Sequence, residues 1–234
     1  PASAVTLQWE RYIAIDRNTT GIPGDELVAT APNSIPDPFW EAATIPLQAG
    51  ETQAVWLEAA IPADAAPGHY DGTLTVTTDG ETAQLAVALH VWNFAVPDER
   101  HLSVVNWWRF PGLGFDGRFE PYSDAYYQFL GECCAFLAAH RQTDIQSSLN
   151  ELIQEVPGAD GKVSYDTSRL ERYAATAFEH GIRQIHLHAV GTRTGNHTDP
   201  AGRIEPVAAA MNRLPALEAV IQQRQWQGRI AVNI

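Results

Sequence analysis

The sequence predicts two domains of different class: a β-sandwich over residues 1–97, and the first half of a (β/α)8 barrel over residues 98–234. Three observations support this prediction. Short apolar runs are interrupted by many Gly and Pro residues as far as Pro97. Beyond that point, helical spacing alternates with strand-like runs. Several of these later runs also have one apolar and one polar face, which suits strands that surround a polar interior.

In the first domain, the clearest strand is Gln84–Trp92, because its apolar residues fall on alternate positions. The run Thr73–Thr78 repeats this alternation, and Asp79-Gly80 between the two runs is typical of a hairpin turn. We expect one face of the hairpin to be buried in a sandwich core. The inward residues would be Leu74, Val76, Leu85, Val87, Leu89 and Val91.

The second domain begins with a strand predicted over His101–Trp108, followed by a helix that Ser123 caps. Helical spacing puts Tyr126, Leu130, Cys133 and Leu137 on one apolar face. Both Cys133 and Cys134 are expected to fill the core. Adjacent cysteines cannot form a disulfide framework, so they do not identify the compartment.

Three further strands and two further helices complete the predicted pattern, which is typical of a parallel sheet. The second helix ends before Gly181, and Gly228 stops the third. The buried face of the second helix would hold Leu170, Tyr173, Ala174, Ala177 and Phe178. In chain order the elements are strand 144–150, helix 168–180, strand 183–190, helix 215–227 and strand 229–234.

The strand faces favour a barrel over an open doubly wound sheet. In the third strand Ile185 and Leu187 share one face, whereas His186 and His188 share the other. An open sheet with helices on both sides needs apolar residues on both faces. A barrel of this type takes roughly 250 residues, so the predicted barrel is incomplete.

The order of motifs resembles glycoside hydrolase family 123, whose members release N-acetylgalactosamine from glycans. The resemblance rests on runs 50–57, 61–72 and 91–97, followed by βα units that begin at 106–108. The middle run has the turn pattern P-x-x-x-x-P-G-x-Y-x-G, in which Pro and Gly set the turn and Tyr packs on the sheet. The resemblance implies an N-terminal sandwich and a (β/α)8 catalytic barrel.

The resemblance also implies a retaining, substrate-assisted reaction, in which the acetamido oxygen of the sugar attacks the anomeric carbon. The family uses an adjacent Asp-Glu pair just after the fourth barrel strand, and the printed sequence stops at that point. The pairs Asp25-Glu26 and Asp98-Glu99 lie elsewhere, so no catalytic residue is assigned. We therefore expect a fragment that is inactive by itself. It would be cut from a longer protein, and the resemblance favours a secreted or periplasmic location.

Substrate-binding residues are expected where the barrel strands end, because barrels of this class place their sites there. Aromatic rings can stack on sugars, and imidazole and amide groups can bind sugar hydroxyls. Glu151 is expected to be a solvated surface charge. The candidates are Trp107, Trp108, Asn150, His188 and Asn233.

Two other functions stay open at this stage. Exposed Trp56 and Trp92 would favour a non-catalytic carbohydrate-binding or adhesion module. Alternatively, His186 and His188 have a spacing that permits two imidazoles on one zinc ion; the chain does not clearly supply a third ligand, although His197 lies in the following loop. The preferred prediction includes no metal and no cofactor.

Composition restricts the partners of the chain. There are 15 Lys and Arg against 28 Asp and Glu, for a net charge of −13, and Lys162 is the one lysine. This balance disfavours nucleic acid. No apolar run approaches the roughly 20 residues that span a bilayer, so no membrane partner is expected. The expected partners are a glycan and, because the half-barrel leaves strand edges unpaired, the missing half or a second copy.

Overall fold

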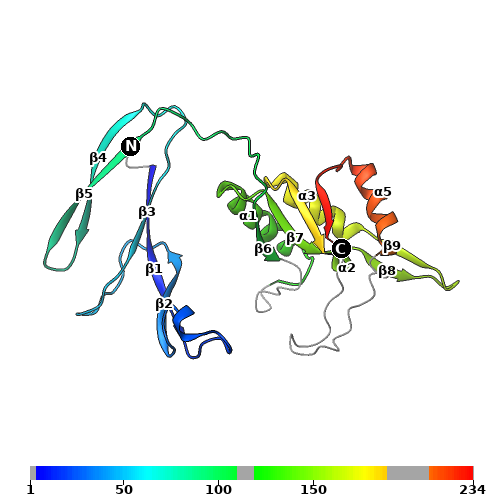
Figure 1. Cartoon of the computed structure of the whole chain (residues 1–234), viewed down its shortest axis with the longest axis horizontal. Coiled ribbons are helices and arrows are strands. Elements are labelled where there is room, and N and C mark those ends of the chain that lie inside the picture. The colour runs from blue at the N-terminus through cyan, green and yellow to red at the C-terminus, as the bar shows by residue number, and fades with distance from the viewer. Residues whose placement is uncertain (1–3, 110–118, 189–210, 234) are drawn as a thin grey trace. The chain divides into compact units, whose positions relative to one another are not determined.

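The computed structural model of the chain describes residues 4–109, 119–188 and 211–233. It divides into two compact units, Pro1–Val96 and Pro97–Ile234. The first contains strands and one short 3-10 helix, whereas the second combines strands with α-helices (Figure 1). Among the described residues, no helix has both the length and the apolar character needed to cross a membrane.

The first unit contains a three-stranded antiparallel sheet in the order β2-β1-β3. The central strand is the longest; its residues 5–9 pair with β3 and its residues 9–15 pair with β2. A short 3-10 helix, η2 (Gly24–Glu26), lies between the first two strands. The strands are β1 (Val5–Ile15), β2 (Asn33–Trp40) and β3 (Val55–Ala59).

The predicted hairpin is present in the same unit as β4 (Gly68–Thr77) and β5 (Thr82–Val91), which pair without a register shift across Asp79-Gly80. Its expected buried face is not found. Leu85 is 57% exposed and Leu89 is 36% exposed, and no described residue of this unit is fully buried. A sheet face is buried only where a second layer covers it, and alternation within a strand does not show whether one does.

The second unit is built on a parallel sheet in the order β6-β7-β10-β11, which is also the order along the chain (Figure 1). Helix α1 connects the first two strands, α3 the next two, and α5 precedes the last. The strands are β6 (Val105–Arg109), β7 (Asp144–Ser148), β10 (Gln184–His188) and β11 (Ile230–Asn233). The helices are α1 (Asp124–Ala139), α3 (Ser168–Glu179) and α5 (Leu214–Arg224).

The helix ends follow the predicted capping residues with one exception. Ser123 caps α1, since its side chain accepts a hydrogen bond from the Tyr126 backbone N–H. Gly181 follows α3 in the left-handed region, with φ of 94°. Helix α5 ends three residues before the predicted Gln227, because Gln225 itself takes the left-handed conformation, with φ of 58°.

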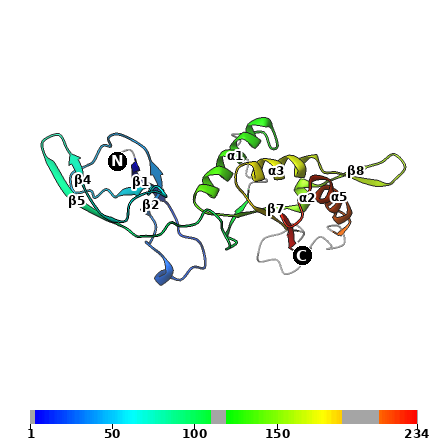
Figure 2. The same cartoon turned by 90° about the horizontal axis from the view of Figure 1, so that it is seen from above.

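One hydrophobic core lies between the sheet and the helices. Its sheet residues share one face, because parallel pairing aligns Ile145, Ile185 and Ile230 in one row. Helices α1, α3 and α5 all contribute buried residues to this same core, and Figure 2 shows α1 and α3 on one side of β7. The predicted α3 face is buried apart from Phe178, which is half-buried.

The α1 face is predicted with one error. Cys134 is fully buried and Cys133 is half-buried, the reverse of the predicted order. Cys134 lies four residues after the buried Leu130 and therefore continues the apolar stripe. Burial raises the pKa of the Cys133 thiol to about 11 and that of Cys134 to about 12. Both are therefore protonated thiols at neutral pH.

Three short elements after β7 were not predicted. Helix α2 (Leu149–Leu152) replaces the last two residues of the predicted strand. A hairpin follows, formed by β8 (Gln154–Pro157) and β9 (Val163–Asp166). The helical turn puts Leu149 and Leu152 on the same side, and both are fully buried. An extended strand would have pointed them in opposite directions.

Helices α1 and α3 approach closely at Gly131. A Cβ atom there would lie 2.8 Å from the His180 ring, which a 2.8 Å contact from Nδ1 to the Thr176 carbonyl holds in place. We expect Gly131→Ala to lower the free energy of unfolding by about 1–3 kcal/mol through overpacking. In a His180→Ala background the same change should stabilise by up to about 1 kcal/mol, because Ala favours helix over Gly. Urea unfolding followed by circular dichroism measures both values, and the same sign in both backgrounds would contradict the proposed steric conflict.

The raised thiol pKa predicts unusual alkylation kinetics for Cys133 in a Cys134→Ala variant. Below the raised pKa of about 11, the protonated, unreactive form predominates. The rate with iodoacetamide should therefore keep rising through pH 10, whereas an ordinary thiol levels off above about pH 8.5–9. The same variant in urea is the matched control and should show the ordinary plateau. A rate that is half-maximal near pH 8.5 in the folded protein would show that burial does not control the pKa of this thiol.

Candidate functional site

The face of the parallel sheet opposite the helices is polar. Pairing places Gln184 beside Asp144, His186 beside Gln146, and His188 beside both Ser148 and Asn233. These residues alternate along each strand with the core residues, so they project to the other side. We call this set of side chains the polar face: Asp144, Gln146, Ser148, Gln184, His186, His188 and Asn233.

Each histidine of the polar face bonds back toward the start of the neighbouring strand. His186 Nε2 lies 3.0 Å from Asp144 Oδ2, and His188 Nε2 lies 2.9 Å from Gln146 Oε1. Carboxylate and amide oxygens accept hydrogen bonds, so each Nε2 is the donor. In the neutral rings Nδ1 therefore carries no proton and has a lone pair.

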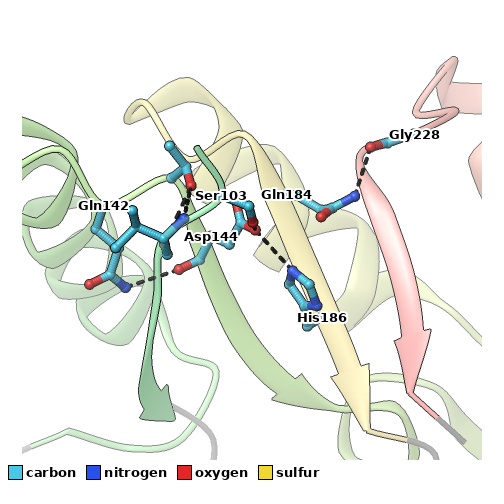
Figure 3. A network of polar contacts seen from close by, with 8 residues as sticks. Ser103, Gln142, Asp144, Gln184, His186 and Gly228 are labelled. Atoms are coloured by element: carbon cyan, nitrogen blue, oxygen red, sulfur yellow. Dashed lines mark hydrogen bonds and ion pairs between the residues drawn. The ribbon is translucent and has the colours of Figure 1, made fainter. Parts of the chain in front are cut away.

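The polar face is most tightly connected at the amino ends of the strands. Asp144 is 2% exposed and accepts hydrogen bonds from Ser103 Oγ and His186, as Figure 3 shows. Gln142 donates to the Asp144 carbonyl at 2.9 Å, and Gln184 donates to the Gly228 carbonyl at 3.0 Å. These contacts link the amino ends of strands β7, β10 and β11.

Arginine side chains surround this amino end. The Arg229 guanidinium lies 3.6 Å from the centre of the Phe178 ring and donates to the carbonyls of Arg183 and Ile182. Burial lowers the pKa of Arg229 below its ordinary value. Arg183 donates in turn to the Arg100 carbonyl. These arginines bind backbone carbonyls that precede the strands, so their role is structural.

A hollow of about 410 Å³ opens at this same amino end, with Ser103, Asp144, Gln184 and Gly228 in its wall. Parallel α/β sheets, whether open or closed into a barrel, bind ligands at the opposite, carboxyl ends of their strands. We therefore place the candidate site at His188, Ser148 and Asn233, which form the last row of the polar face.

The structure brings two of the five predicted substrate-binding residues together. His188 and Asn233 are register partners at the carboxyl ends of β10 and β11. Asn150 does not end a strand as predicted, because it lies in α2, where its buried Oδ1 has no hydrogen-bond partner among the described residues. Trp107 and Trp108 lie within β6, and their side chains are outside the described part of the structure.

Glu151 differs from the prediction of a solvated charge. It is half-buried in α2, and its Oε2 atom is buried. Its charge contributes to the raised pKa of Tyr122, which reaches about 12 mainly through burial. Burial also raises the pKa of Tyr126 and Tyr173. Glu151 therefore lies near the tyrosines at the start of α1 and is not the solvated surface charge that the sequence predicts.

The predicted zinc alternative gains no support from the described residues. His186 and His188 each direct Nε2 to a different side chain, and no group of three or more His, Cys, Asp or Glu within the described ranges could hold a metal ion. His197, the predicted third ligand, lies outside those ranges.

Asp144 is the important polar residue that the sequence analysis passed over. It stood only at the start of a predicted strand. However, it precedes Gln146 by two residues, so the same alternation places it on the polar face. The signal was present, but a carboxylate beside Thr143 did not by itself indicate burial.

Comparisons with known proteins agree with the sequence-based resemblance. Residues 1–78 match the model of the glycoside hydrolase 123 N-terminal domain. The fold resembles a solved structure described as revealing the details of glycolipid glycan hydrolysis by a family 123 glycoside hydrolase from Clostridium perfringens. The TM-score is 0.79 at 13% identity, and the match covers 100% of this chain and 46% of that chain. A search of curated proteins finds no match. The predicted resemblance to glycoside hydrolase family 123 is thereby confirmed.

The polar network at the amino end makes a stability prediction. Asp144→Ala should lower the free energy of unfolding by about 1–3 kcal/mol, because it removes the acceptor of the hydrogen bonds from Ser103 and from the partly buried His186. Asp160→Ala is the control, since Asp160 pairs with Lys162 where both side chains are mostly exposed, and it should change stability by less than about 1 kcal/mol. Urea unfolding measures both. If the two substitutions lower the free energy of unfolding equally, the hydrogen bonds to Asp144 contribute no more to stability than an exposed ion pair does.

Proposed function

We propose that this chain, which resembles glycoside hydrolase family 123, is part of a glycoside hydrolase that acts on N-acetylhexosamine-containing glycans. Residues 1–97 would form its β-sandwich domain, and residues 98–234 the first half of its (β/α)8 barrel. The printed title of the similar Clostridium perfringens structure concerns glycolipid glycans. A glycolipid glycan that contains N-acetylgalactosamine is therefore the substrate class we propose.

The observation that carries this proposal is the division of the parallel sheet into one helix-covered face and one polar face. The strand order β6-β7-β10-β11 follows the chain without reversal. A doubly wound sheet reverses its order at a switch point and places helices on both faces. A sequential order with helices on one side is what a (β/α)8 barrel requires, and the polar face would then line its interior.

In the proposed site, the sugar lies at the carboxyl ends of the strands. The side chains of His188 and Asn233, which are paired in register, would bind hydroxyl or acetamido groups. Bonding to Gln146 fixes the orientation of the His188 ring. Trp107 or Trp108 would stack on the sugar, and Asn150 would contribute an amide from α2.

The proposed reaction is retaining and substrate-assisted. The acetamido oxygen forms a bond to the anomeric carbon as the bond to the leaving-group oxygen breaks, and a general acid donates the proton to that oxygen. Water then opens the cyclic intermediate with the same carboxyl group as base. None of residues 1–234 is assigned as this general acid in the proposal.

The test is hydrolysis of para-nitrophenyl N-acetyl-β-galactosaminide. Under this proposal, a chain that continues these residues with an adjacent Asp-Glu pair after β11, called here the full chain, should release nitrophenol, and residues 1–234 by themselves should release none. His188→Ala should lower kcat/KM about tenfold, the cost of one hydrogen bond to a sugar. His140→Ala is the matched control, since His140 is exposed at the end of α1 and should leave the rate unchanged. No release by the full chain would contradict the proposed activity.

One observation favours a second function, a non-catalytic carbohydrate-binding module. Trp92 is 67% exposed and Trp56 is 48% exposed in the first unit. Both rings have an aromatic neighbour, Phe39 for Trp56 and His90 for Trp92, so the larger exposed fraction makes Trp92 the more accessible ring. If glycan binding is lost in Trp92→Ala, retained in His188→Ala and accompanied by no hydrolysis, the binding module is the correct function.

A further inference from the structure

Two histidines face each other across the β4–β5 hairpin, in the unit remote in sequence from the polar face. His69 and His90 are direct register partners. Both side chains are exposed, and their ring centroids are 4.4 Å apart. His69 occupies one of the positions that the P-x-x-x-x-P-G-x-Y-x-G turn pattern leaves open, so the turn itself does not require a histidine.

The ring nitrogens lie at a separation that two ligands on one metal ion can adopt. His90 Nδ1 lies 3.4 Å from His69 Nδ1 and 3.3 Å from His69 Nε2. Zinc–nitrogen bonds measure roughly 2.0–2.1 Å, so two nitrogens at the tetrahedral angle lie about 3.3 Å apart. His90 Nδ1 lies almost equally far from both His69 nitrogens, so the His69 ring must rotate to direct one lone pair at an ion that His90 shares.

We propose that His69 and His90 form a binding site for a divalent transition ion of the zinc class. Imidazole nitrogens suit Zn²⁺, Ni²⁺ and Cu²⁺. In the metal-free chain the two neutral rings can share one hydrogen bond between nitrogens, and a metal ion replaces this bond with two stronger coordination bonds. The inference goes beyond the proposed glycosidase function, since the two histidines belong to the first unit.

The surroundings of the pair favour a cation. Asp71 lies two residues after His69 on the same face of β4, and the chain carries a net charge of −13. No third His, Cys, Asp or Glu within the described ranges is close enough to complete a ligand group. Water therefore completes the coordination shell, so the site is open to exchange and binds its ion more weakly than a closed structural site does.

Zinc titration of residues 1–234 by isothermal calorimetry tests the proposal. His69→Ala and His90→Ala should each weaken zinc binding at least about tenfold, because even an outer-shell partner of a metal is worth roughly 10–100-fold in affinity. The double variant should bind zinc only slightly more weakly than either single variant. In each single variant the one imidazole that remains can no longer chelate the ion. His101→Ala is the matched control, because His101 is an exposed histidine 3.8 Å from Glu99, and it should leave the affinity unchanged.

A second measurement reports on the position of the ion. The Trp92 ring lies with its centroid 4.6 Å from that of His90, so bound Cu²⁺ should quench the fluorescence of Trp92. Trp92→Phe should remove that quenched component while zinc affinity is retained. Unchanged zinc affinity in both histidine variants, or copper quenching that persists fully in Trp92→Phe, would overturn the proposed site.

Discussion

The organisation of the second unit depends on the burial of one face of a parallel sheet. Ile145, Ile185 and Ile230 lie in one row across three strands. The first two are fully buried, and the third packs against the same core. A shift of β10 by one residue would put His186 and His188 among the helices and expose Ile185 and Leu187 to the polar side. Burying imidazole without a partner is costly, so the apolar row sets the register and the polar face follows from it.

With this register, the polar side chains at the two ends of the sheet differ in burial and in hydrogen bonding. At the amino end, Asp144 and Gln142 are buried, and their side chains bond to groups on neighbouring segments. At the carboxyl end, His188 and Asn233 are less enclosed. A network that is closed at one end and accessible at the other suits a scaffold that holds binding groups in place. The hollow at the amino end is consequently a poor guide to the position of a site.

Sequence patterns were informative where local and tertiary requirements coincide. Ser123 and Gly181 end helices for local reasons, and the alternation in β10 matches the face that the helices cover. The patterns were less informative where tertiary packing overrides the local preference of the residues. Helix α2 forms because its two leucines must point to one core, although the residues before it read as strand. The β8–β9 hairpin has four residues in each strand, too few for alternation to be distinctive.

In the first unit, the sequence pattern predicts the strand pairing but does not predict which residues are buried. Register and turn of the β4–β5 hairpin follow from Asp79-Gly80 and the alternating residues, yet Leu85 and Leu89 are exposed. Alternation fixes only which residues share a face, and burial depends on a second sheet that no local pattern specifies. The same distinction applies to the polar face. Its residues are determined by pairing within four strands, whereas its enclosure requires further strands beyond the edges β6 and β11. Exposed edges pair readily with added strands, and closure into a barrel removes them altogether. In the proposed barrel, the interior at His188 would therefore depend on strands beyond these four, whereas the direction of the side chains on the polar face follows from the pairing of the four strands themselves.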